Sequence, residues 1–136
     1  MKRWTRYAVL IGTVFSLAGC SDDECETVAC TMEFRSFSVA VVNEAGEPVT
    51  GLQPVVSLVR TDEELDFSDT GPGDPESGVY LVMTDGHGSL IEQDEEPVRF
   101  TATTGQLSVT GDFVFGMTMC RCHVEQLSGP DTLVMR

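Results

Sequence analysis

Two histidines and many carboxylates are the residues of this 136-residue chain that could take part in acid–base chemistry. His87 lies within Gly86-His87-Gly88, a turn in which we expect an exposed imidazole. His123 alternates with cysteines, and we expect it on the outer surface of a strand. The sequence contains no Gly-x-Ser-x-Gly elbow, no His-Glu-x-x-His pair and no phosphate-binding loop. It therefore predicts no catalytic residue and a protein that is not an enzyme.

Runs of carboxylates offer the oxygen ligands that calcium prefers. One run contributes Asp62, Glu64, Asp66 and Asp69, and a second contributes Glu92, Asp94 and Glu96. Neither run has the Asp-x-Asp-x-Asp-Gly spacing of a calcium loop. We therefore expect solvated acidic loops without a bound metal, and the first run supplies the calcium ligands of an alternative hypothesis.

The first twenty residues have the organisation of an export signal. Three cations precede an apolar stretch, Ala8 to Leu17, that is too short to cross a bilayer as a helix. The next residues, Leu17-Ala18-Gly19-Cys20, resemble a bacterial lipobox, in which the cysteine sulfur receives a diacylglyceryl group before cleavage. We therefore expect removal of residues 1–19 and attachment of the protein to the outer membrane through a lipid on Cys20.

The residues after Cys20 are acidic, as is the chain as a whole. Ser21-Asp22-Asp23-Glu24 resembles an export signal that carries some bacterial lipoproteins to the cell surface, and the alternative is a solvated tether. The formal net charge is −14, and it becomes −17 without residues 1–19, which contain three cations and no anion. This charge argues against nucleic-acid binding and against attraction to anionic lipids. A protein or glycan partner remains open.

Lipidation of Cys20 leaves four cysteines, in one pair near each end of the mature chain. In an oxidising compartment such an even number predicts two disulfides, which would join the first strand to a late one. A zinc site from the same four thiolates, with His123 as a further ligand, is the alternative. Its C-x4-C and C-x-C spacings differ from the usual C-x2-C. A local Cys25–Cys30 bridge is possible, whereas a Cys120–Cys122 bridge would be strained, so the spacing leaves the connectivity open.

Alternation of apolar and polar residues predicts short strands along the mature chain. The expected strands cover Ser36–Val42, Val55–Thr61, Gly78–Thr84, 98–103, 107–109, 113–117, 120–125 and Asp131–Arg136, with a further short strand at 89–92. Within the third of these, Val79, Leu81 and Met83 share one face. Residues 62–78 read as a long polar loop. Because no stretch has a helical period, about seven to nine strands predict an all-β, antiparallel β-sandwich.

One resemblance to a known family lies in Ser38–Val49, where a strand leads into an Asn-Glu-Ala-Gly turn and a Pro-Val pair. This segment resembles the opening hairpin of carboxypeptidase-regulatory-like domains, which have a transthyretin-like or Ig-like sandwich. With Cys30–Arg35, Cys120–Glu125 and Ser128–Pro130, residues 30–136 are similar to small bacterial lipoproteins of this architecture. The resemblance implies disulfides between Cys30 and Cys122 and between Cys25 and Cys120. It implies no catalytic residue.

These observations together define the expected organisation and role. We expect a signal peptide at 1–19, the lipidated cysteine and acidic tether at 20–29, and the sandwich domain at 30–136. The expected role is structural or binding, on the periplasmic or cell-surface face of the outer membrane, without a cofactor. The alternative is a calcium-dependent adhesion or ligand-binding module. A small hydrolase or accessory domain is disfavoured because the sequence shows no nucleophile with its base.

Overall fold

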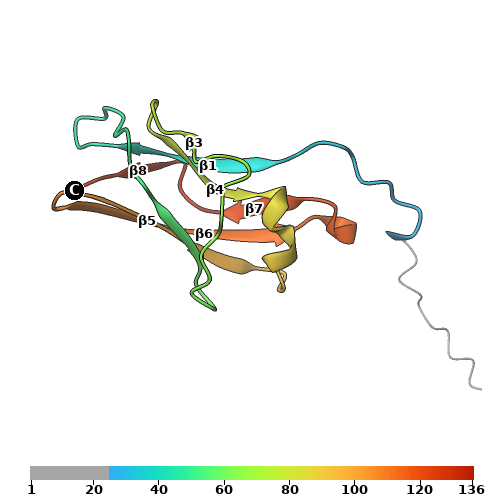
Figure 1. Cartoon of the computed structure of the whole chain (residues 1–136). Coiled ribbons are helices and arrows are strands. Elements are labelled where there is room, and N and C mark those ends of the chain that lie inside the picture. Colours follow the sequence, from blue (N-terminus) through green and yellow to red (C-terminus); the bar gives the residue numbers. More distant parts are fainter. Residues whose placement is uncertain (1–24) are drawn as a thin grey trace, which may run out of the picture.

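The computed structural model describes residues 25–136, so the segment expected to be an export signal, Cys20 and Ser21–Glu24 lie outside the described part. Two four-stranded sheets pack face to face, which confirms the predicted β-sandwich (Figure 1). One sheet has the strand order β3-β4-β1-β8 and the other β2-β5-β6-β7. The β1–β8 pair is parallel and the other pairs are antiparallel. Between residues 25 and 136 no helix is long and apolar enough to cross a membrane.

The elements follow one another in short segments. They are β1 (Ser36–Val42), β2 (Val55–Leu58), β3 (Gly73–Asp74), β4 (Val79–Thr84), the 3-10 helix η2 (Asp85–Leu90), β5 (Glu96–Thr104), β6 (Leu107–Met117), the 3-10 helix η3 (Met119–Arg121), β7 (Val124–Ser128) and β8 (Thr132–Val134). The first strand has the predicted bounds, and β2 is shorter than predicted. The strand expected at 89–92 is wrong, because η2 and an irregular segment occupy this region. The two strands expected at 107–109 and 113–117 are one continuous strand, β6.

The core lies between the sheets and follows the alternation of most strands. Val39 and Val41 of β1 and Val98 and Phe100 of β5 belong to the same buried cluster, and all four are fully buried. Aromatic rings link the two layers, since Tyr80 of β4 lies 6.3 Å from Phe100 between ring centroids. Successive side chains of a strand point to opposite faces of its sheet, so alternate side chains are buried where one face of each sheet packs against the other sheet.

Strand β4 departs from simple alternation. The residues that face the core are Tyr80 and Val82, whereas Val79 and Leu81 are half-buried. Met83 is nonetheless fully buried, because the register with β1 shifts at this point: Phe37 pairs with Met83, and Ser38 pairs with Leu81. Val82 is thus the extra residue of a β-bulge, which changes the face on which the following side chains lie. The predicted common face of Val79, Leu81 and Met83 is therefore wrong.

The strand expected at 120–125 is wrong over residues 120–123. Cys120 and Arg121 have φ angles of 62° and 53°, which are incompatible with a strand. A tight turn is closed by the Arg121 N–H, which donates to the Thr118 carbonyl, and by the Thr118 N–H, which donates to the His123 carbonyl, both at 2.8 Å. Strand β7 therefore begins at Val124. Cys120 and Cys122 lie in this turn and do not share a strand face.

Candidate functional site

Both disulfides lie at the end of the sandwich where β6 turns into β7. The structure joins Cys25 to Cys120 and Cys30 to Cys122, each with a Cα–Cα distance of 5.2 Å. This connectivity is the one that the family resemblance implied. The turn at 118–123 positions the two later cysteines, so the N-terminal segment is covalently fixed beside η3.

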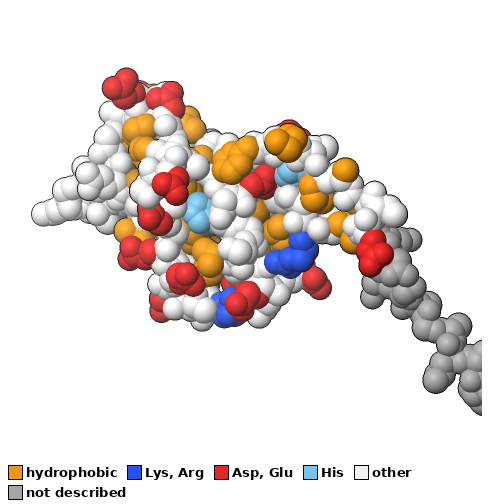
Figure 2. All heavy atoms as spheres, turned by 45° about the vertical axis from the view of Figure 1, so that its right-hand side comes forward, with side chains coloured by type: hydrophobic (Ala, Val, Ile, Leu, Met, Phe, Trp, Pro, Cys, Tyr) orange, Lys and Arg blue, Asp and Glu red, His pale blue; other side chains and the backbone are white. Residues whose placement is uncertain are grey.

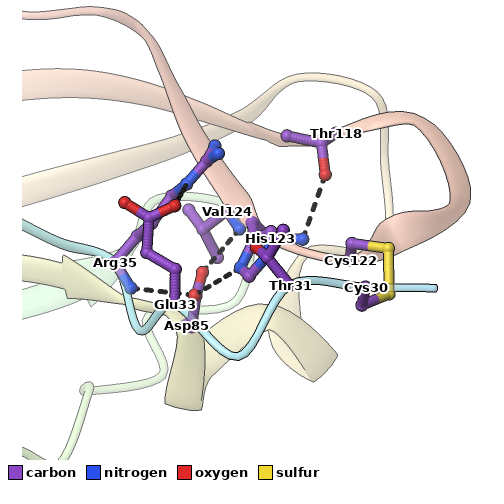
Figure 3. Close-up of polar contacts among 9 residues, drawn as sticks. All are labelled: Cys30, Thr31, Glu33, Arg35, Asp85, Thr118, Cys122, His123 and Val124. Atoms are coloured by element: carbon purple, nitrogen blue, oxygen red, sulfur yellow. Dashed lines mark hydrogen bonds and ion pairs between the residues drawn. A yellow bond between two sulfur atoms is a disulfide. The ribbon is translucent and has the colours of Figure 1, made fainter.

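A chain of hydrogen bonds continues from this segment into the fold (Figure 3). The Thr31 hydroxyl lies 2.8 Å from His123 Nε2, and His123 Nδ1 lies 2.8 Å from Asp85 Oδ2. The same carboxylate accepts the backbone N–H groups of Arg35 at 2.9 Å and Val124 at 2.8 Å. Asp85 at the start of η2 therefore connects the N-terminal segment with the start of β7.

The protonation states in this network follow from its geometry. Burial disfavours the charged carboxylate of Asp85, but the hydrogen bonds from His123, Arg35 and Val124 outweigh it and lower the pKa of Asp85. The ionised carboxylate of Asp85 can only accept hydrogen bonds, so His123 Nδ1–H donates to it, and the Thr31 hydroxyl contacts the other ring nitrogen, Nε2. The His123 side chain is 8% exposed, so its predicted position on an outer strand surface is wrong.

The order of hydroxyl, imidazole and carboxylate is that of a nucleophilic triad, which sequence reasoning did not find. The three residues are 92 and 38 positions apart in the chain, so no local motif could have revealed them. A triad also needs a substrate cleft and donors for an oxyanion. Three hollows on the described surface have linings that include neither Thr31 nor His123. The network itself links the N-terminal segment, through Thr31 and Arg35, to η2 and the start of β7.

His87 belongs to a second buried network, which contradicts its predicted exposure. Its Nδ1 lies 2.9 Å from the Thr84 hydroxyl, and its Nε2 lies 2.8 Å from the Asp66 carbonyl oxygen. The Phe67 ring packs edge-on against the imidazole at 4.7 Å between centroids. His87 in η2 thereby holds part of the long loop between β2 and β3 against the sandwich.

This loop forms one wall of a hollow with a volume of about 590 Å³. The other walls are the segment before β2 and strand β4. Its apolar lining includes Leu52, Pro54, Leu65, Phe67, Pro72 and Leu81. A mostly apolar hollow of this size is typical of a site for a small ligand or a few side chains. The sequence held a signal for it, since Leu65 and Phe67 are two apolar residues within an otherwise polar loop.

The structure does not gather the proposed calcium ligands into a metal site. Asp62, Glu64, Asp66 and Asp69 are all exposed, and Asp66 accepts the N–H of Ser68 at 2.8 Å. Within residues 25–136 no three His, Cys, Asp or Glu side chains are arranged to hold a metal ion.

In the second acidic run, Glu96 differs from its neighbours because its side chain is completely buried at the start of β5. Arg60 Nε lies 3.3 Å from Glu96 Oε1, and the same guanidinium lies 3.1 Å from the exposed Glu92. The hydrogen bond to Glu96 is the main cause of a raised pKa of Arg60, against the opposing effect of burial. Glu96 is therefore half of a partly buried ion pair, whereas the sequence suggested a solvated turn.

Comparison of the chain with models of protein families, with curated proteins and with solved structures finds no match. The function must therefore be argued from the two features described above, the cross-linked end of the sandwich and the apolar hollow.

Proposed function

We propose that the protein is a lipid-anchored binding module of the outer membrane, without catalytic activity. The lipobox-like residues before Cys20 support the anchor. The two disulfides support a domain held close to the anchor. Cys25 is fixed to Cys120, and only four residues separate Cys25 from Cys20. Fully extended, this stretch reaches on the order of 15–18 Å. The sandwich would thus stand near the bilayer on a short tether.

The apolar hollow is the observation that carries the binding role. Its wall contains Phe67 and Leu81, and the loop beside it carries exposed carboxylates at Asp66, Asp69 and Asp74. No Lys or Arg occurs between Arg60 and Arg99 to neutralise them. An apolar cavity with an acidic border fits a ligand that combines an apolar group with a positive charge. The proposed ligand class is therefore a basic peptide with an aromatic or aliphatic side chain.

A short tryptophan peptide tests this proposal directly. Trp4 is the single tryptophan of the chain and lies in the segment expected to be removed, so the mature protein adds no indole fluorescence. Lys-Trp-Lys should bind with a blue shift of its emission, and the charge-reversed Glu-Trp-Glu should not. Leu81→Gln should weaken binding about tenfold, because one apolar contact is lost.

Leu107→Gln is the matched control, since Leu107 is an exposed leucine that does not line this hollow. Absence of Lys-Trp-Lys binding would contradict the proposed ligand class. Equal weakening by Leu81→Gln and Leu107→Gln would contradict the proposed site.

The anchor is tested by Cys20→Ala. The variant should move from the detergent-soluble membrane fraction to the soluble fraction, because the acyl chains supply the attachment. Retention in the membrane fraction would contradict lipidation of Cys20. Digestion of the unaltered protein by protease added to intact cells would indicate the cell-surface face, and full protection would indicate the periplasmic face.

A further inference from the structure

The cross-linked end of the sandwich exposes large apolar side chains. Met32 is 102% exposed, Met119 77%, Phe34 58% and Val28 47%, and together they form what we call the apolar end. Three of them lie in the irregular segment before β1, and Met119 lies in η3. Such exposure is unusual beside a core in which most apolar side chains are buried.

The disulfides hold these side chains at one end of the molecule. Cys25–Cys120 fixes the segment next to Met119, and Cys30–Cys122 fixes it again just before Met32. Figure 1 places the segment and η3 at the right of the sandwich, with the β5–β6 hairpin and the C-terminus at the opposite end. In Figure 2 apolar side chains are visible at the surface toward the right-hand end of the sandwich. The apolar end is therefore the end from which the chain leads to Cys20.

We infer that the apolar end, Val28, Met32, Phe34 and Met119, lies against a lipid surface. This inference rests on the proposed anchor. A lipid on Cys20 would hold Cys25 within the reach of four residues, which brings the apolar end to the level of the headgroups. At the level of the headgroups, thioether and aromatic side chains become buried among the lipids without crossing the bilayer.

The charges around the apolar end define the kind of lipid. Glu26 and Glu33 are exposed in the same segment, and Asp22, Asp23 and Glu24 precede it in the sequence. Two cations lie beside these carboxylates: the side chain of Arg35 lies 3.9 Å from Glu33, and Arg121 of η3 donates to the Ile91 carbonyl, so the acidic residues outnumber the basic ones. Anionic headgroups would repel this surface. The lipid surface that fits has zwitterionic headgroups.

A tryptophan at Met32 reports contact with lipid. The lipidated full-length mature protein carrying Met32→Trp would be reconstituted into phosphatidylcholine vesicles with or without brominated acyl chains. We expect a blue-shifted emission that bromine quenches by about half, because the indole enters the interface. Leu107→Trp is the matched control. Leu107 is also exposed, and it begins β6, whose far end at Met117 leads to η3 about 33 Å away. Its emission should remain red-shifted and unquenched.

The outcomes separate this inference from the anchor. If the protein floats with the vesicles but the indole of Met32→Trp is not quenched, the anchor stands and the lipid contact is refuted. If the protein does not float, the anchor fails and the inference fails with it. A blue shift that depends on protein concentration in the absence of vesicles would assign the apolar end to a second copy of the chain. Equal quenching in anionic phosphatidylglycerol vesicles would overturn the zwitterionic preference.

Discussion

Removal of either disulfide alone should lower the free energy of unfolding much less than the subsequent removal of the remaining one. The sequence separations are 95 and 92 residues, so either bridge alone closes a long loop. In the chain-entropy treatment such a loop contributes about 4–5 kcal/mol at 25 °C. Once one bridge is present, the other closes only a small ring, with four residues between Cys25 and Cys30 and one residue between Cys120 and Cys122. A ring of this size contributes roughly 2–3 kcal/mol.

The measurement is denaturation by guanidinium chloride, followed by far-UV circular dichroism, in a Cys20→Ala background that stays in aqueous solution. The double substitution Cys30→Ala/Cys122→Ala should lower the free energy of unfolding by roughly 2–3 kcal/mol, and so should Cys25→Ala/Cys120→Ala. Replacement of all four cysteines should lower it by roughly 7 kcal/mol. The slope of the free energy of unfolding against denaturant concentration should increase mainly in the fourfold variant, because only its unfolded chain has no disulfide to keep it compact.

Two results would refute this reasoning. A loss of about 4–5 kcal/mol on removal of either bridge alone would show that the bridges stabilise the protein independently. An unchanged stability of the fourfold variant would show that the unfolded chain is not constrained by them. Full-length protein with both bridges, unfolded with and without prior reduction, provides the control for effects of the alanine side chains.

Three further substitutions test the buried networks and the packing. The lowered pKa of Asp85 means that its carboxylate stabilises the fold above the ordinary value of 3.8 and loses this effect as the pH falls through the folded pKa. The stability difference between the unaltered protein and Asp85→Asn, measured by thermal melts, should therefore be largest near neutral pH and shrink in acid. Arg60→Ala should lower the unfolding midpoint more than Arg99→Ala. The first change leaves the fully buried carboxylate of Glu96 without its cation, whereas Arg99 pairs with the exposed carboxylate of Asp112. Equal unfolding midpoints of the two variants would contradict this reasoning. Gly129→Ala should cost about 1–3 kcal/mol more than Gly46→Ala in chemical denaturation, since both have positive φ but only the first would push a Cβ into an aromatic ring of β6.

The strands and their inward faces could be read from the sequence wherever the alternation was regular. Val39 and Val41, and likewise Val98 and Phe100, are the alternate apolar residues of their sequence segments, and all four are buried. This works because the side-chain direction in a strand depends only on local backbone geometry. The number of disulfides also followed from the sequence, given an exported chain with four remaining cysteines.

The inward face of β4 and the turn at 118–123 were decided by tertiary structure. The bulge at Val82 arises from the register between two strands, and no residue type in β4 marks it. Cys120 and Arg121 adopt positive φ in a turn that two disulfides hold, whereas their alternation with Cys122 and Val124 resembles a strand. In both places the sequence pattern was real, but contacts between distant segments overrode it.

The two histidines show which features a local sequence pattern does not reveal. Local residues identify His87 as a turn residue and His123 as a neighbour of cysteines, and both descriptions are correct. Their burial depends on acceptors that the chain supplies from far away: the Asp66 carbonyl, 21 residues from His87, and the Asp85 carboxylate, 38 residues from His123. An imidazole can leave water only when both ring nitrogens find partners. Whether such partners are present is decided by the packing of the two sheets and the long loop, which a local pattern does not encode.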